Sequence, residues 1–205
     1  MYKFKKKNIY PTEKKFREVT LWLFIFFIWS CTGDLVEFRG PCGGFEYESN
    51  SIKHLSLVAS GSGATPCIQL VRDIMADPDD QTSVSLLYHT DKESDLMFKS
   101  ELDGYNAHDG RFHVYYSVSE GAETENWQGG EGHIDKDMIS DHLTGPQALD
   151  HKILLCGGPT MIVSVMRSLS LVGYSSEQIF VYGQFGAEQV RAVYGRNAKL
   201  SSHRL

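Results

Sequence analysis

From residue 51 onward, short apolar runs alternate with longer stretches in which apolar residues recur at helical spacing. Short runs rich in branched and aromatic residues are typical of buried strands, and amphipathic stretches between them are typical of crossover helices. The predicted strands are 55–59, 84–88, 112–118, 153–156 and 179–182, and the predicted helices are 66–75, 91–102, 135–143 and 159–171. Right-handed crossovers between such strands give an α/β fold with a doubly wound parallel five-stranded sheet.

The chain before and after this region follows other patterns. Residues 1–32 combine a basic start with an apolar run from Leu21 to Trp29, whereas residues 33–50 resemble short strands closed by a Gly-Pro turn. Residues 184–205 show no clear pattern. We therefore divide the chain into 1–32, 33–50, 51–183 and 184–205, with a domain boundary near residue 50.

The apolar run from Leu21 to Trp29 admits several interpretations. Even counted from 19 to 32, it would form a helix of about 21 Å, shorter than the ~30 Å hydrocarbon core of a bilayer. A secretory signal starts closer to the N-terminus and ends in small residues, unlike Trp29-Ser30-Cys31. Association with a membrane surface, a cleaved signal, and a buried segment or non-native extension all remain open.

Charge and reactive side chains exclude some classes of function. The formal net charge is -6, and residues 1–18 hold seven Lys or Arg against two Glu, so the remainder carries -11. An acidic body of this kind does not favour nucleic-acid binding. The chain has four widely spaced cysteines and eight scattered histidines without metal-ligand spacing, so we expect no metal site and reduced thiols in the cytoplasm.

The first candidate site is a glycine turn at residues 59–66, between a predicted strand and a predicted helix. Gly61 and Gly63 allow a sharp turn and a close approach of the backbone to a ligand. Thr65 is expected to cap the helix and Pro66 to occupy its first position, and a helix start of this kind favours anions. Pro66 stands where the common dinucleotide fingerprint has its third glycine. A nucleotide site and a purely structural turn therefore both remain open.

A second glycine turn, residues 155–161, follows the fourth predicted strand. Its Cys156 would stand at the strand end, on the same edge of the sheet as Thr65. A small, polarisable and neutral side chain at that position can pack against a nicotinamide ring. An unpaired cysteine at a strand end is also common as a core residue.

Three motifs occur in a fixed order along the chain: GDLVEFRGPCGGFEY at 33–47, SGSGATP at 60–66 and CGGPTM at 156–161. Together they resemble the NADH-cytochrome b5 reductase family, within the ferredoxin-reductase-like flavoenzymes. The similarity extends over residues 33–183. It implies a ferredoxin-reductase-like NAD-binding domain preceded by a remnant of a flavin-binding β-barrel.

The resemblance implies that NADH lies across both glycine turns. Thr65 and Cys156 would stand beside the hydride-transfer centre as the catalytic residues. Ser119, with Glu120 beside it, would correspond to an acidic residue that meets ribose hydroxyls. The implied cofactor-binding residues are Gly61, Ser62, Gly63, Ala64, Thr65, Pro66, Ser119, Glu120, Cys156, Gly157, Gly158, Pro159 and Met161.

The implied activity is hydride transfer from NADH to FAD, followed by electron transfer to a haem protein such as cytochrome b5. The implied location is cytoplasmic, at the face of the endoplasmic reticulum or the mitochondrial outer membrane. The family's Arg-x-Tyr-Ser/Thr flavin motif is absent, and residues 1–32 are too few for the flavin barrel, so the sequence does not account for FAD binding by this chain alone. The alternative is a catalytically silent nucleotide-binding or interaction module.

Overall fold

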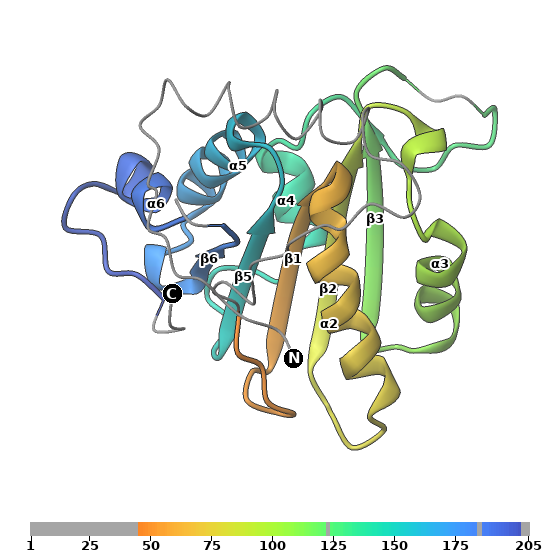
Figure 1. Ribbon diagram of the computed structural model, residues 1–205, viewed down its shortest axis with the longest axis horizontal. Helices are drawn as coiled ribbons and strands as arrows, with labels where there is room; N and C mark the ends of the chain where they lie inside the picture. The colour runs from red at the N-terminus through yellow and green to blue at the C-terminus, as the bar shows by residue number, and fades with distance from the viewer. Residues whose placement is uncertain (1–44, 122–123, 184–185, 202–205) are drawn as a thin grey trace, which may run out of the picture. The chain divides into compact units, whose positions relative to one another are not determined.

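The computed structural model describes residues 45–121, 124–183 and 186–201. Its centre is a six-stranded sheet with the order β4-β3-β2-β1-β5-β6, in which every pair of neighbours is parallel (Figure 1). The strands are β1 (His54–Ser60), β2 (Ser83–Thr90), β3 (Phe112–Val118), β4 (Gly130–Glu131), β5 (His151–Cys156) and β6 (Ile179–Val181). The five predicted strands are confirmed, and β4 is an addition too short to leave a periodic pattern.

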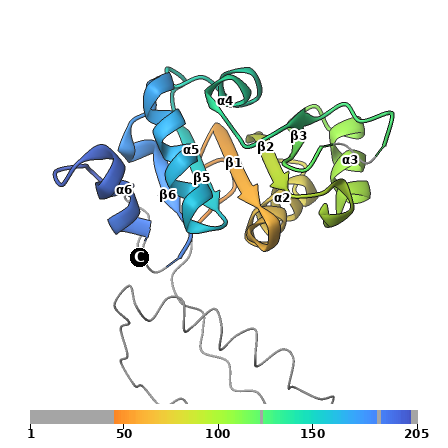
Figure 2. The same cartoon turned by 90° about the horizontal axis from the view of Figure 1, so that it is seen from above.

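Helices cover both faces of the sheet, as the view from above shows (Figure 2). They are α2 (Ala64–Ala76), α3 (Lys99–His108), α4 (Lys136–His142), α5 (Pro159–Val172) and α6 (Gly186–Tyr194). Successive strand residues point to opposite faces, so Leu57 packs in the cluster with α2 and α3 while Val58 packs with α4, α5 and α6. The doubly wound α/β fold predicted from the sequence is confirmed.

One predicted helix was placed wrongly. Residues 91–98 are not α-helical: a short 3₁₀ turn, Glu93–Asp95, is followed by Phe98 in the left-handed conformation, with φ of 59°. The α-helix α3 begins only at Lys99 and continues to His108. Leu96 is buried although it lies in a loop. Its apolar side chain therefore fitted a helical pattern in a segment that is not helical.

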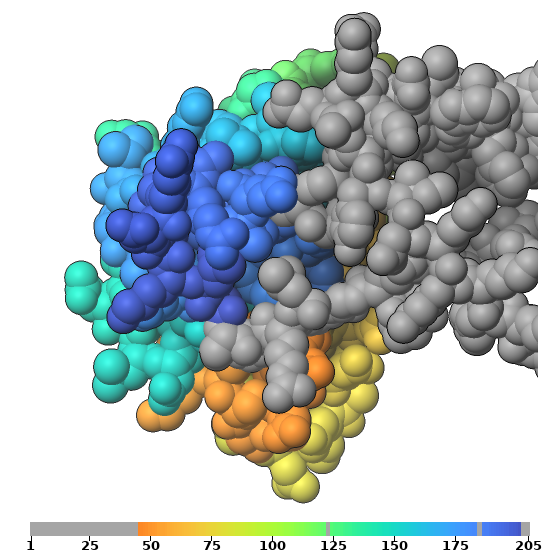
Figure 3. Space-filling view, turned by 60° about the vertical axis from the view of Figure 1, so that its left-hand side comes forward, coloured from red at the N-terminus to blue at the C-terminus, as the bar shows by residue number. Residues whose placement is uncertain are grey.

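The segment after β6, undecided from the sequence, contains α6, which packs beside α5. Val190 is buried in the cluster that α5 contributes to, and the hydroxyl of Tyr194 donates to the carbonyl of Met166 at 3.4 Å. In the space-filling view the blue C-terminal part forms a continuous surface with the lighter blue α5 region (Figure 3).

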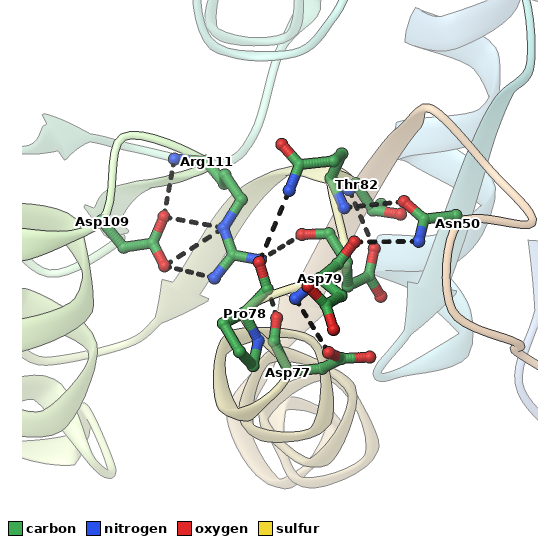
Figure 4. Close-up of polar contacts among 9 residues, drawn as sticks. Asn50, Asp77, Pro78, Asp79, Thr82, Asp109 and Arg111 are labelled. Carbon is green, nitrogen blue, oxygen red and sulfur yellow. Dashed lines mark hydrogen bonds and ion pairs between the residues drawn. The ribbon is translucent and has the colours of Figure 1, made fainter.

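A polar cluster around Arg111 lies at the end of the sheet where the strands begin, away from their carboxyl ends (Figure 4). The guanidinium of Arg111 donates to the carboxylate of Asp109, with Nη2 to Oδ2 at 2.6 Å, and to the carbonyls of Asp77 and Asp80. The amide of Asn50 joins the same loop by donating to the carbonyl of Asp79 at 3.0 Å. One planar cation therefore connects the loop after α2 to the start of β3.

Replacing Arg111 with alanine is expected to lower the free energy of unfolding by about 2 kcal/mol, because it leaves several half-buried acceptors without their donor. Arg72 provides a matched control, since its bidentate pair with Glu101 has 46% and 32% side-chain exposure against 21% and 24% for Arg111 and Asp109. Surface pairs contribute little, so Arg72→Ala should cost much less. Urea unfolding of both variants measures the difference, and equal losses would contradict it.

A buried histidine at the start of β5 makes stability depend on pH. His151 is 3% exposed, and its Nε2 shares a hydrogen bond of 2.8 Å with the hydroxyl of Ser56. Burial, and secondarily the neighbouring His54, lower the pKa of His151 to about 4. The unfolded chain, with an ordinary pKa near 6.5, therefore binds more protons than the folded one between pH 6.5 and 4.

We expect the protein to lose about 2 kcal/mol of unfolding free energy between pH 7 and pH 5 through His151 alone. The His151→Gln variant should lack this part of the pH dependence. His113→Gln, which changes an exposed histidine on β3, serves as the control and should retain it. Urea unfolding at both pH values measures the effect, and identical pH dependence in the two variants would show that His151 is not responsible.

The predictions for residues 1–32 and the barrel remnant up to residue 44 lie outside the described residues. Among the helices that the structure does describe, none combines the length and apolar character needed to cross a bilayer. Phe45 and Tyr47, from the end of the predicted remnant, pack against the sheet domain: the Phe45 and Phe180 rings are 5.4 Å apart, and Tyr47 donates to Asp80 at 2.5 Å.

Candidate functional site

The two glycine turns predicted from the sequence lie side by side at the carboxyl ends of β1 and β5. These strands are neighbours in the sheet, and Ala59 pairs with Cys156 in their register. From β1 the chain runs to β2, β3 and β4 on one side and then returns to β5 on the other, so the strand order reverses at this point. Ligands of doubly wound sheets bind in the crevice outside such a switch point.

The backbones of the two turns touch at Gly63. A Cβ on Gly63 would lie 2.3 Å from the carbonyl oxygen of Cys156 and 2.8 Å from the amide nitrogen of Gly157. Gly157 in turn approaches Ser60, where an added Cβ would lie 3.0 Å from the serine Cβ. Only glycine permits this contact, which joins the two turns into one wall of the crevice.

The first turn leads into α2 differently from the prediction. Gly61–Gly63 form a 3₁₀ turn that continues directly into α2 at Ala64, and Gly61 adopts a left-handed φ of 52°. Thr65 is therefore inside the helix, where its hydroxyl donates to the carbonyl of Ser62 at 2.9 Å. The predictions that Thr65 caps the helix and that Pro66 is its first residue are wrong. The α2 N-terminus still opens at the strand end, as an anion site requires.

The second turn matches its prediction. Gly158 caps α5 and Pro159 occupies its first turn. Cys156 is partly buried and forms no disulfide, and burial raises the pKa of its thiol. The side chain is therefore neutral near pH 7 and suited to packing, because a nucleophilic cysteine needs a lowered pKa. Met161, in the first turn of α5, places its Cε 2.5 Å from the position that a Cβ on Gly157 would take.

Tyr182, immediately after β6, joins this side of the crevice and was not identified as a site residue from the sequence. Its amide donates to the carbonyl of Leu155 at 2.9 Å, beside Cys156. Burial raises the pKa of its hydroxyl, and the nearby thiols of Cys67 and Cys156 raise it further. The phenol is thus neutral and provides an aromatic surface next to Cys156. An aromatic residue at the end of the last strand was the only sequence signal.

Ser119 and Glu120 lie at the end of β3, on the other side of β1 from Cys156. The hydroxyl of Ser119 donates to Asp91 at 2.8 Å, and Glu120 forms an ion pair with Lys92 at 3.5 Å. Asp91, which follows β2 directly, lies at the same strand ends, where ligands of doubly wound sheets bind, although no specific role was predicted for it from the sequence.

His89 also lies at these strand ends, and no specific role was predicted for it from the sequence. Its Nδ1 shares a hydrogen bond of 2.9 Å with the hydroxyl of Ser117, and its ring centre is 5.4 Å from that of His133. Burial, followed by the neighbouring His133, lowers the pKa of His89. A neutral imidazole therefore borders the crevice next to Ser60, its register partner on β1.

A pocket of about 500 Å³ lies between the segment around Phe45 and helix α2, and its lining includes Pro66 and Tyr182, so it adjoins the glycine crevice. Its lining includes Asp73 and Asp77. Carboxylates disfavour an anionic dinucleotide, whereas the glycine crevice offers a helix N-terminus and open space beside Gly61 and Gly158, where an added Cβ would meet nothing within 4 Å. The residues of the glycine crevice fit a dinucleotide.

No group of three or more His, Cys, Asp or Glu within the described residues is placed to hold a metal ion.

Comparison with known families agrees with this geometry. Residues 57–167, which contain both glycine turns, match the family described as the oxidoreductase NAD-binding domain. The chain belongs to this family. The residues that match this family thus extend from β1 into α5.

Similar proteins include an NADH-cytochrome b5 reductase 1 of Mortierella alpina, 37% identical over 69% of this chain and 47% of its own length. A plasma membrane-associated coenzyme Q6 reductase of Saccharomyces cerevisiae is 36% identical over 74% of this chain and 50% of its own. The cytochrome b5 reductase domain of Ulva prolifera nitrate reductase superposes with a TM-score of 0.70 at 26% identity, covering 78% of this chain and 65% of that domain. The resemblance to cytochrome b5 reductases is confirmed. The chain spans about half the length of the curated relatives it matches.

Proposed function

We propose that this NAD-binding domain belongs to an NADH-dependent flavoprotein oxidoreductase of the cytochrome b5 reductase type. The observation that carries the proposal is the contact between Gly63 and Cys156. It joins an anion-binding helix start and a neutral packing surface in one crevice at the switch point of the sheet.

Each side of the crevice has its own role. The first backbone amides of α2 bind the pyrophosphate, and Gly61 and Gly63 leave room for it to approach them. Cys156 and Tyr182 form the surface against which the nicotinamide ring packs, and Thr65 lies at the mouth of the first turn. These residues orient the ring and exclude water from it, while the cofactor itself supplies the hydride.

We propose FAD as the hydride acceptor and a haem protein such as cytochrome b5 as the final electron acceptor, because the relatives include NADH-cytochrome b5 reductases. A quinone is a further candidate acceptor, since one relative is named a coenzyme Q6 reductase. The matched region covers about half of these relatives, so an alternative function is a nucleotide-binding or interaction module without reductase activity.

Purified full-length protein distinguishes these functions. Flavin absorption together with NADH-dependent reduction of ferricyanide is the result expected for the oxidoreductase. A colourless protein that binds NADH in a fluorescence titration would support the module. Protein that binds neither NADH nor flavin would overturn both proposals.

We also propose that the run from Leu21 to Trp29, outside the described residues, associates the protein with a membrane surface at the cytoplasmic face of the endoplasmic reticulum or mitochondrial outer membrane. The basic residues of 1–18 support this, because they are attracted to anionic lipids. Fractionation should find the protein in the membrane pellet and release it with salt or carbonate. Protein that stays in the supernatant without either treatment would contradict this proposal.

A further inference from the structure

The pocket beside the glycine crevice has the size of a small-molecule site, with a volume of about 500 Å³. One wall is a single face of α2, on which Pro66, Leu70 and Asp73 recur at helical spacing. The other wall comes from the segment 45–49, and Tyr182 contributes from the end of β6. Segments far apart in the chain thus build one concave surface next to the crevice.

Aromatic side chains in the lining of this pocket are held by contacts of their own. The Phe45 and Phe180 rings pack edge to face with their centres 5.4 Å apart, and Phe180 packs against Tyr182 in the same way at 5.3 Å. The hydroxyl of Tyr47 donates to the carboxylate of Asp80 at 2.5 Å. The aromatic surface is therefore formed before any ligand arrives, as is usual for small-molecule sites.

The charged part of the lining is acidic. Three of its ten residues are carboxylates, namely Asp73, Asp77 and Asp80, and none of the ten is basic. Arg111 donates to the backbone carbonyls of Asp77 and Asp80, but its charge is already paired with the carboxylate of Asp109 at 2.6 Å. The pocket therefore presents a net negative charge beside aromatic rings, and this combination recognises cations.

Two of these carboxylates lie where the helix itself disfavours them. Asp73 and Asp77 are four residues apart at the C-terminal end of α2, and Asp77 is its C-cap. Like charges at this spacing repel each other, and the helix dipole adds a negative partial charge at the same end. Ser49 donates to Asp77 at 3.0 Å, whereas Asp73 takes no part in the ion pairs within the described residues. A bound cation would relieve this repulsion.

We propose that this pocket binds an organic cation, a small ammonium compound with an apolar body. The ammonium group pairs with Asp73 and Asp77, and the body packs against the aromatic side chains. The inference goes beyond the proposed oxidoreductase function, because the binding needs no dinucleotide. Tyr182 also lies beside Cys156, so the occupant would be a second ligand next to the proposed nicotinamide surface.

Three indole compounds test the charge preference. Tryptamine, tryptophol and indoleacetate share one ring system and carry a positive, a neutral and a negative group respectively. In calorimetric titrations of the full chain without nucleotide, tryptamine should bind at least about fivefold more tightly than tryptophol, and indoleacetate more weakly than either. High salt should reduce the difference, because it screens the charges.

Variants of single carboxylates locate the site. Asp73→Asn should lower the affinity for tryptamine about threefold and leave that for tryptophol unchanged, and adding Asp77→Asn should remove the preference for tryptamine. Asp79→Asn is the matched control, because Asp79 is exposed in the same loop but does not line the pocket. It should keep the wild-type affinity within about twofold. Thermal unfolding checks the fold, and Asp73→Asn should melt no lower than the wild type, since it removes a repulsion.

The outcomes separate this inference from the proposed function. Equal affinities for the three compounds, or no binding of tryptamine, would overturn the inference. It would also be overturned if Asp79→Asn lost as much affinity as Asp73→Asn, because the overall charge would then be responsible. A protein that binds tryptamine as expected but neither NADH nor flavin would overturn the proposed function and leave this inference standing.

Discussion

Replacing Gly63 with alanine is expected to lower the free energy of unfolding by about 3 kcal/mol and to weaken NADH binding at least about tenfold. The added Cβ would lie 2.3 Å from the carbonyl oxygen and 2.5 Å from the carbonyl carbon of Cys156. Both are backbone atoms that cannot rotate away, so the two turns must separate. Gly63 itself has a φ of -64°, which suits any residue, and the loss would therefore come from the contact and not from backbone strain.

Gly104 provides the matched control for this substitution. It lies in α3, and a Cβ there meets nothing within 4 Å. Gly104→Ala should leave NADH binding unchanged and raise the stability slightly, because alanine favours the helix. Urea unfolding and NADH fluorescence titrations measure both properties. If Gly63→Ala matched Gly104→Ala in both, the close approach of the turns would not be needed for the fold or for the site.

The sequence predicted the parts of the site that depend on local chemistry. The positions of Gly61 and Gly63 at a strand end, and of Pro159 at the start of a helix, follow from the backbone preferences of these residues. The start of α2 was predicted two residues too late, at Pro66 in place of Ala64, because a 3₁₀ turn joins the helix without a break. Nothing in the local sequence distinguishes that continuation from an ordinary cap.

The roles that were not predicted depend on contacts between distant segments. Asp91 and Tyr182 follow β2 and β6 respectively, and each becomes a site residue only because its strand takes a particular place in the sheet. The error over residues 91–102 has a related cause. Leu96 and Leu102 are both buried, which fits a helical pattern, but Leu96 is buried from a loop and Phe98 turns the chain before α3 begins.

The arrangement of the sheet also explains why the site needs two turns. A single helix start binds a phosphate but does not determine how the rest of a dinucleotide lies. The strand register fixes Cys156 beside Ala59 on one side of β1 and His89 beside Ser60 on the other. The proposed pyrophosphate site thus lies between two surfaces of different chemistry: a neutral, partly buried one at Cys156 and a charged one at Asp91.

Replacing Cys156 with alanine is expected to slow hydride transfer from NADH by about tenfold to a hundredfold while changing NADH affinity less than about threefold. The thiol is neutral because burial raises its pKa, so its contribution is the contact that aligns the nicotinamide ring. Most of the binding energy is expected to come instead from the pyrophosphate at the proposed site on α2, which this substitution leaves intact. The dissociation constant from fluorescence titration and the rate of NADH-dependent ferricyanide reduction by flavin-loaded protein measure the two effects separately.

Cys156→Ser and Cys67→Ala are the controls for this prediction. Serine retains most of the volume of the thiol and should recover much of the rate, whereas Cys67 is fully buried in α2, so its truncation should lower stability more than rate. Contact with the ring can also be observed without turnover, because bound NAD⁺ should slow alkylation of Cys156 by iodoacetamide. Equal losses of affinity and rate in Cys156→Ala, or alkylation that NAD⁺ does not slow, would show that Cys156 does not pack against the nicotinamide.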